Sequence, residues 1–98
     1  MLSQKTRYTI RALQHLSDNW RQGPVRLDAI AGAQNIPRKF LTVILSEMVR
    51  EGLIISHRGR EGGYELARPA ADISIADVLR CIDGPLASVR DIGLGDLP

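Results

Sequence analysis

Apolar residues recur every three or four positions over the first fifty residues of the chain, a spacing typical of amphipathic helices. The first helix is predicted from about Ser3, which can serve as its N-cap, to about Asn19. Its side chains separate into an apolar face and a polar face. The apolar face, which we expect to be buried, consists of Ile10, Leu13, Leu16 and Trp20.

A turn at residues 21–24 separates this helix from a second, shorter helical segment. Asp28 is placed to cap that segment, which ends near Gln34 and is expected to bury Ile30 and Ala31. The next helix follows after only a few residues. Two helices joined by so tight a turn predict a helix-turn-helix.

The third helix is predicted to begin at Pro37 and to stop at Gly52. Projection at about 100° per residue gives it two faces. The face expected to be buried contains Leu41, Ile44, Leu45 and Met48. The opposite face contains Lys39, Val43, Ser46 and Arg50, with Thr42 on its flank. Such a mixture of cations, small polar groups and a compact apolar group suits a recognition helix in the major groove, although a solvated surface can have the same composition.

Two runs of strand-forming residues, 53–58 and 63–67, flank the sequence GREG and predict a β-hairpin. Ser74 and Asp77 are spaced like a capping box at the start of a fourth helix that ends at Gly84. The stripe that this helix is expected to bury consists of Ile75, Val78, Leu79 and Ile82. The order of elements predicts a mainly α fold with a small β-hairpin, a winged helix-turn-helix.

Composition narrows the class of protein. The 98 residues suffice for one small domain, and no apolar run approaches the roughly 20 residues that span a bilayer. A single cysteine, Cys81, excludes an internal disulfide, so we expect a cytoplasmic protein. His15 and His57 have no thiol or carboxylate at ligand spacing. We therefore expect neither a metal site nor an enzyme.

Charge is divided unevenly along the chain. The formal net charge is +2, but residues 1–68 hold 11 Lys or Arg against 6 Asp or Glu, whereas residues 69–98 hold 2 against 5. The first part therefore carries +5 and the second −3. A basic front part indicates contact with a polyanion.

The sequence HRGREGGYEL places arginines and glycines together in the predicted hairpin loop. Arg58, Gly59 and Arg60 form a thin, cationic segment of the kind that fits the narrow, negative minor groove. Glu61 at the tip counts against that interpretation. Alternatively, the glycines only make the turn and the arginines only keep it solvated.

Five segments give the chain a resemblance to the Rrf2 family of bacterial winged-helix regulators, which contains an iron-sulfur-cluster regulator, a nitric-oxide sensor and a cysteine-metabolism repressor. They are LSQKTRYTIRAL, PVRLDAIAGAQNIPRKFL, GLI, RGREGGYELARP and ISIADVLRCIDGPL. The resemblance implies a cytoplasmic homodimeric transcription factor, usually a repressor, that binds a palindromic operator in double-stranded DNA. It also implies a domain over residues 1–86, with 87–98 beginning a linker toward a C-terminal dimerisation helix.

Contact residues follow from the same resemblance, position by position. Wing contacts would fall on Arg58, Gly59 and Arg60. Contacts from the recognition helix would fall on Arg38, Lys39 and Thr42, and contacts to the DNA backbone on Gln4, Lys5 and Arg7.

One departure from the family bears on cofactors. Members with an iron-sulfur cluster carry three cysteines after the fourth helix, the first of them at about Asp91, where this chain has none. The chain thus resembles the branch without a cluster, and Cys81 is expected to be a core residue rather than a redox sensor. Two alternatives stay open: a winged-helix module that binds another protein, and a regulator that senses a redox change or a ligand.

Overall fold

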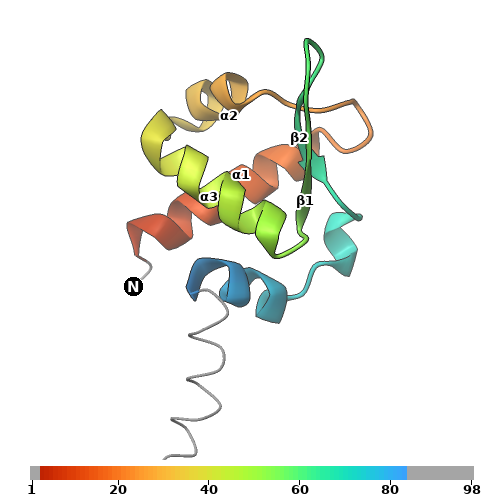
Figure 1. Cartoon of the computed structure of the whole chain (residues 1–98). Helices are drawn as coiled ribbons and strands as arrows, with labels where there is room; N and C mark the ends of the chain where they lie inside the picture. Colours follow the sequence, from red (N-terminus) through yellow and green to blue (C-terminus); the bar gives the residue numbers. More distant parts are fainter. Residues whose placement is uncertain (1–2, 84–98) are drawn as a thin grey trace, which may run out of the picture.

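The computed structural model describes residues 3–83. Figure 1 shows the helices of the first fifty residues packed together, with a hairpin rising beside them and a further helix below. The elements are α1 (Gln4–Asp18), α2 (Leu27–Gln34), α3 (Arg38–Arg50), β1 (Ile54–His57), β2 (Gly63–Leu66), the 3₁₀ turn η1 (Ala70–Asp72) and a helix over 75–83. The predicted winged helix-turn-helix is confirmed.

Helix α1 begins as the sequence predicts, because the Ser3 hydroxyl accepts a hydrogen bond from the Thr6 amide at 3.1 Å. Its predicted buried face is confirmed for Leu16, and Leu13 and Trp20 are partly buried against the core, but Ile10 is wrong. Thr9, Ala12 and Leu16 are buried, whereas Ile10 is 40% exposed. The small side chains of Thr9 and Ala12 let α1 approach the other helices closely, and this turns Ile10 away from the core.

The tight turn between α2 and α3 is confirmed, but the capping of α2 differs from the prediction. Arg26, not Asp28, occupies the N-cap of α2, and it makes no capping bond through its side chain. Asp28 lies in the first turn instead, where its negative charge complements the helix dipole. Asn35 closes α2 in a left-handed conformation with φ of 54°, and Pro37 precedes α3 as its N-cap.

The core is aliphatic and centres on α3. All of the α3 side chains predicted to be buried are at most 3% exposed. They pack with residues from the other helices and the hairpin, chiefly Leu16, Ile30, Ile36, Leu53, Ile54 and Leu66. Burial of each such side chain contributes about 1.5–3 kcal/mol. This cluster fixes α3 against α1 and α2, so its opposite face remains at the surface.

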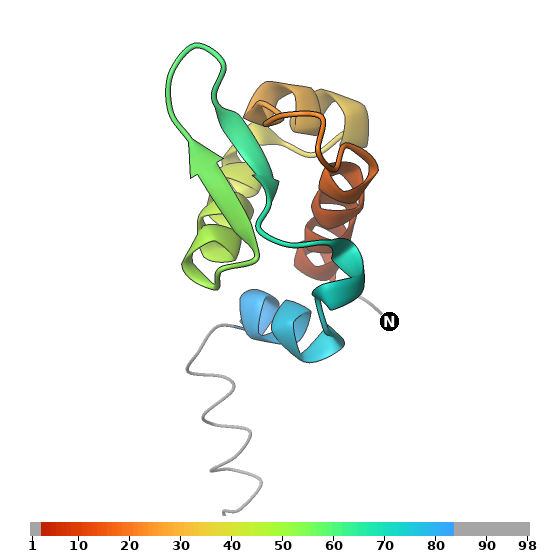
Figure 2. The same ribbon diagram turned by 90° about the vertical axis from the view of Figure 1, so that its right-hand side faces the viewer.

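The hairpin is antiparallel, with Ile54 opposite Leu66 and His57 opposite Gly63. Its loop closes through a hydrogen bond from the Gly62 amide to the Gly59 carbonyl at 3.0 Å. Val25, just before α2, adds a bridge to Tyr64 through two backbone hydrogen bonds of 2.8 Å each. Figure 2 shows the resulting wing standing beyond the helical body.

Glycine is required where the wing meets the segment before α2. A Cβ on Gly63 would lie 2.5 Å from the Val25 carbonyl oxygen, and the residue has φ of 147°. A Cβ on Gly62 would lie 2.2 Å from the His57 carbonyl oxygen. Both contacts are with backbone atoms, which cannot move aside without breaking the bridge or the turn.

Arg68 and Asp77 attach the helix 75–83 to the rest of the domain. The Arg68 guanidinium donates to the Gly52 carbonyl at 3.2 Å, to the Asp72 carbonyl at 3.1 Å and to the Asp77 carboxylate at 2.9 Å. The predicted capping box is confirmed, since Asp77 accepts from the Ser74 amide and its own amide donates to the Ser74 hydroxyl.

These contacts lower the pKa of Asp77, with the hydrogen bond from the Ser74 backbone as the largest cause and Arg68 as a further one. A lowered folded-state pKa means that Asp77 stabilises the domain above its ordinary pKa, 3.8. This stabilisation is lost as the pH falls through the lower, folded-state pKa.

The predicted stripe of the helix 75–83 is wrong for two of its four residues, since Val78 and Ile82 are partly buried but Ile75 and Leu79 are not. Ile75 is 78% exposed and Leu79 is 52% exposed, while Cys81 is only 2% exposed and joins the core. The anchored Asp77 turns the helix so that Cys81, not Ile75 or Leu79, faces the body. Among residues 3–83, no helix is long and apolar enough to cross a membrane.

Replacement of Gly63 by alanine is expected to lower the free energy of unfolding by about 2 kcal/mol or more, because the added methyl group meets the Val25 backbone. Gly32 in α2 is the control, since a Cβ there has nothing within 4 Å. Gly32→Ala is expected to stabilise the protein by about 0.5–1 kcal/mol. Urea denaturation followed by circular dichroism measures both; equal stability of Gly63→Ala and the unmodified protein would contradict the close approach.

Replacement of Asp77 by alanine is expected to raise the rate at which a thiol reagent labels Cys81 about fivefold, because it removes the contacts of that carboxylate with the Ser74 amide and Arg68, and local opening of the helix then exposes the thiol. The control is Asp72→Ala, since Asp72 contributes only its backbone carbonyl to the Arg68 contacts. Equal labelling rates for the two variants would show that Asp77 does not hold this helix in place.

Candidate nucleic-acid interface

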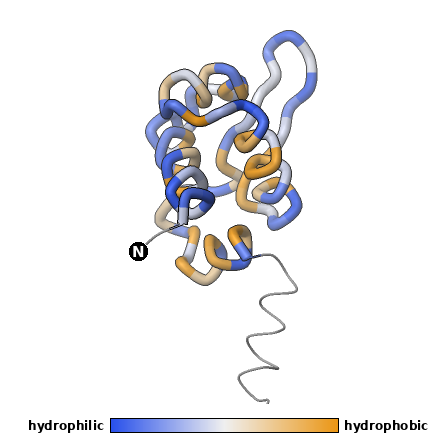
Figure 3. The backbone as a smooth tube through the Cα atoms, turned by 90° about the vertical axis from the view of Figure 1, so that its left-hand side faces the viewer, coloured by the Kyte–Doolittle hydropathy of each residue, from blue (hydrophilic) through white to orange (hydrophobic). Residues whose placement is uncertain are grey.

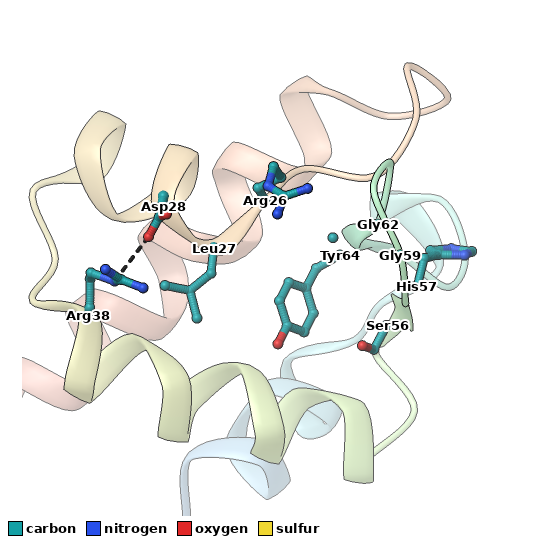
Figure 4. Close-up of a pocket in the computed structure, with 10 residues that line it drawn as sticks. Arg26, Leu27, Asp28, Arg38, Ser56, His57, Gly59, Gly62 and Tyr64 are labelled. Atoms are coloured by element: carbon teal, nitrogen blue, oxygen red, sulfur yellow. Dashed lines mark ion pairs between the residues drawn. The ribbon is translucent and has the colours of Figure 1, made fainter.

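The starts of α2 and α3 and the wing face one another across a hollow of about 270 Å³. Figure 4 shows Arg38 and Asp28 on one side of this hollow, His57 and Gly62 of the wing on the other, and Arg26 and Tyr64 between them. Val25 holds the hairpin beside the start of α2 through its bridge to Tyr64, and the wing and the start of α3 line the same hollow.

The outward face of α3 matches the prediction. Lys39, Thr42, Val43 and Ser46 are all exposed. The Thr42 hydroxyl donates to the Arg38 carbonyl at 2.8 Å, which leaves its methyl group and oxygen lone pairs available to a partner. The Lys39 ammonium lies 5.6 Å from the centre of the Phe40 ring, so an aromatic face supports this cation.

Arg38 and Asp28 form an ion pair across the helix-turn-helix. The distance from Arg38 Nε to Asp28 Oδ1 is 3.0 Å, and the side chains are 73% and 67% exposed. The acid occupies the first turn of α2 and the arginine is the first residue of α3. The pair therefore lies at the surface that the two helix starts share.

Arg58, Gly59 and Arg60 lie in the wing loop and are all exposed. The Arg60 carbonyl accepts a hydrogen bond of 2.8 Å from Arg26 Nη1, so the cation at the start of α2 braces the loop. Below the loop, His57 pairs with Glu65 across the two strands. The wing thus presents its arginines from a loop that is held at its base and its side.

Gln4, Lys5 and Arg7 occupy the first two turns of α1, beside the middle of α3 rather than at its start. Gln4 Nε2 donates to the Tyr8 hydroxyl at 2.9 Å, and Lys5 pairs with Glu47 of α3 at 3.0 Å. Arg7 is exposed. Of the predicted contact residues, Arg38 and Gly59 line the hollow between α3 and the wing. Gln4 and Lys5 line a second hollow, which they share with Phe40, Val43 and Ile44 of α3.

Sequence reasoning missed Arg26 and the partnership of Asp28 with Arg38. Arg26 could have been identified from the sequence, because it directly precedes the short helix of the predicted helix-turn-helix. The ion pair of Asp28 with Arg38 could not be predicted from helical spacing, because its two residues belong to different helices. Its geometry depends on the left-handed Asn35 between them.

The donors available for a metal are few. Residues 3–83 contain no group of three or more His, Cys, Asp or Glu side chains that could hold a metal ion. Burial, together with the charges of Glu47 and Glu51, raises the pKa of the Cys81 thiol to about 11. A buried, protonated thiol is a poor ligand and a poor nucleophile. The described residues therefore do not fit an iron-sulfur cluster, and the position at about Asp91 lies outside them.

Comparison with known proteins gives related regulators. A protein of Mycobacterium tuberculosis named as an HTH-type transcriptional regulator is 60% identical over 97 residues, which cover 99% of this chain and 60% of that protein. IscR of Cronobacter sakazakii is 33% identical over 94 residues, covering 96% of this chain and 58% of IscR. The chain thus spans about 60% of the length of these curated relatives.

Solved structures share the fold. CymR, the global cysteine regulator of B. subtilis, matches with a TM-score of 0.79 and 32% identity, over 87% of this chain and 66% of CymR. IscR of T. potens matches with a TM-score of 0.80 and 30% identity, over 99% of this chain and 76% of IscR. These relatives are named as regulators and not as enzymes.

The family model of Rrf2, described as an iron-dependent transcriptional regulator, matches residues 2–95. This range includes the helix-turn-helix, the wing and the helix that follows them. Because the match extends over almost the whole chain and the fold agrees with that of named regulators, the chain belongs to the Rrf2 family of transcriptional regulators.

Proposed function

We propose that the chain is a sequence-specific DNA-binding regulator, a homodimeric repressor that reads the major groove with α3 and the minor groove with the wing. The observation that carries this proposal is that the start of α3 and the wing loop border one hollow, which Arg38 and Gly59 line. Both elements are cationic and exposed, with Lys39 next to Arg38 and with Arg58 and Arg60 on either side of Gly59. Membership of a family of transcriptional regulators supports it.

The dimensions of α3 suit the major groove. Its 13 residues extend over about 20 Å, and a groove about 12 Å wide admits one helix. Arg38 and Lys39 offer donors for guanine or phosphate, Thr42 and Ser46 offer small polar groups, and Val43 can contact a thymine methyl group. These side chains lie on the face opposite the core, where no other element of residues 3–83 covers them.

The wing loop suits the minor groove. The loop between the strands is only five residues long, residues 58–62, and it contains two arginines. A narrow minor groove concentrates negative potential and attracts arginine. Gly59 lacks a side chain that would hold the loop away from the sugars. Arg26, which braces the loop, is close enough to the same surface to contact a flanking phosphate.

The α1 residues are proposed to contact the DNA backbone beside α3. Arg7 is exposed and can reach a phosphate as it stands. Lys5 is paired with Glu47, so a phosphate would have to share or replace that carboxylate. We therefore expect Arg7 to contribute more than Lys5 to phosphate binding.

Dimer formation is proposed to use the C-terminal dimerisation helix that the family resemblance implies, together with the exposed apolar side chains of the helix 75–83. Ile75 and Leu79 expose large apolar side chains there, and Ile10 exposes another on α1. Figure 3 shows apolar residues concentrated along this lower helix, in contrast with the polar tip of the wing. Exposed apolar side chains of this kind mark interfaces. Two-fold symmetry of such a dimer would call for a palindromic operator.

Regulation is proposed to occur without an iron-sulfur cluster. The family description is iron-dependent, but the described residues offer only one cysteine, and its thiol is buried and protonated. What the chain senses would then act through another feature. The proposal for DNA binding does not depend on that signal.

Removal of a wing arginine is expected to weaken binding to a duplex selected by the protein from a random pool. Arg58→Ala and Arg60→Ala should each weaken it about tenfold and reduce the slope of log affinity against log salt by about 1. Fluorescence anisotropy across a salt series measures both quantities. Arg11→Ala, which removes an exposed arginine from α1, is the control and should have a smaller effect.

Two results would contradict the proposal. Selection that recovers no preferred sequence would exclude a sequence-specific regulator and favour a module that binds protein. Equal losses of affinity in Arg60→Ala and Arg11→Ala would show that the wing arginine contributes only its positive charge and no specific contact with DNA.

A further inference from the structure

We propose that Asp28 is a specificity-determining residue that acts by positioning Arg38. Its carboxylate aims the Arg38 guanidinium at base edges and disfavours the use of that guanidinium on phosphates. This inference rests on the proposed function, because it concerns how the same surface distinguishes one DNA sequence from another.

The first argument is that stability does not explain the ion pair. Both side chains are largely exposed, at 73% for Arg38 and 67% for Asp28. Exposed ion pairs contribute between zero and about 1 kcal/mol to folding. The pair nevertheless lies between α2 and α3, at the point where Figure 4 shows the hollow between the helices and the wing.

The second argument concerns the helix dipoles. A carboxylate in the first turn of α2 is favoured by the partial positive charge of that helix end, so Asp28 has an electrostatic reason to remain where it is. Arg38 at the start of α3 has the opposite preference, because its charge is repelled by the same kind of helix end. The acid is therefore the fixed partner and the arginine is the one that is held.

The third argument concerns the donors that remain. Contact through Nε, at 3.0 Å from Asp28 Oδ1, leaves the two terminal nitrogens of Arg38 with N–H groups free. Two parallel N–H donors match the O6 and N7 acceptors of guanine in the major groove. Arginine loses considerable rotamer freedom when it binds, and a guanidinium that is already anchored loses less.

The fourth argument is repulsion. A phosphate that approaches Arg38 as a point charge also approaches the Asp28 carboxylate, which repels it. A guanine edge is uncharged and can be bound while the ion pair stays intact. The acid therefore penalises contacts that any DNA sequence could make, which is how a repulsive element creates specificity.

The test compares Asp28→Asn with Glu61→Gln. Each removes one negative charge, and Glu61 lies in the wing loop without an ion pair to any residue of 3–83. Dissociation constants are measured on the selected duplex and on a scrambled duplex at one salt concentration, and their ratio is the discrimination. Asp28→Asn should strengthen binding to scrambled DNA and reduce discrimination about tenfold, the effect of losing one bidentate base contact. Glu61→Gln should strengthen both and change discrimination less than twofold.

A double-mutant cycle shows whether Asp28 acts through Arg38. In an Arg38→Ala background, Asp28→Asn should change discrimination less than twofold. An undiminished effect in that background would overturn the positioning role, as would unchanged discrimination in Asp28→Asn alone. A melting temperature of each variant within a few degrees of that of the unmodified protein would establish that the changes in discrimination do not arise from loss of the fold.

The outcomes separate this inference from the proposed function. If the unmodified protein discriminates and Asp28→Asn does so equally well, the positioning role is overturned and the regulator remains. If the unmodified protein itself binds both duplexes equally, the proposed function and the role of Asp28 are both overturned.

Discussion

The position of the wing depends on the short bridge between Val25 and Tyr64. Two backbone hydrogen bonds of 2.8 Å join these residues, and Gly63 permits the approach because it has no Cβ. Through this bridge the hairpin is fixed to the segment that leads into α2, and α2 is fixed to α3 through the tight turn at Asn35. One continuous chain of backbone contacts thus sets the spacing between the wing arginines and α3. In the proposed function, that spacing allows one protein surface to contact two grooves.

Two of the arginines on this surface have specific partners that hold their side chains in place. Arg26 donates to the wing loop, and Arg38 is held by Asp28. Lys5, by contrast, is already paired with Glu47 in the body. The surface therefore combines cations with acids that pair with them, and we propose that these acids limit where the cations contact DNA. A net charge of only +2 is compatible with DNA binding for this reason, since the arrangement matters more than the total.

Much of the fold could be predicted from the sequence because helical spacing and turn residues are local signals. The α3 core face, the Ser3 cap, the Ser74 and Asp77 capping box and the hairpin were all predicted correctly. The errors arose where tertiary contacts decide the outcome. Ile10 has helical spacing but is displaced by the smaller Thr9 and Ala12 face, and the Arg68 contact to Asp77 holds the helix 75–83 in an orientation that exposes Ile75 and Leu79. The expected burial of Cys81 is confirmed. The ion pair of Asp28 with Arg38 had no local signal, and the roles of the predicted contact residues remain predictions.

The central claim, that α3 and the wing occupy different grooves of one DNA site, is tested most directly by dimethyl sulfate footprinting. This reagent methylates guanine N7 in the major groove and adenine N3 in the minor groove, so one experiment reports on both. We predict protection of guanine N7 at the centre of each half-site and of adenine N3 beside it, with only the adenine protection lost in the Arg58→Ala/Arg60→Ala variant. Protection confined to the major groove, or loss of both signals together in that variant, would contradict the account.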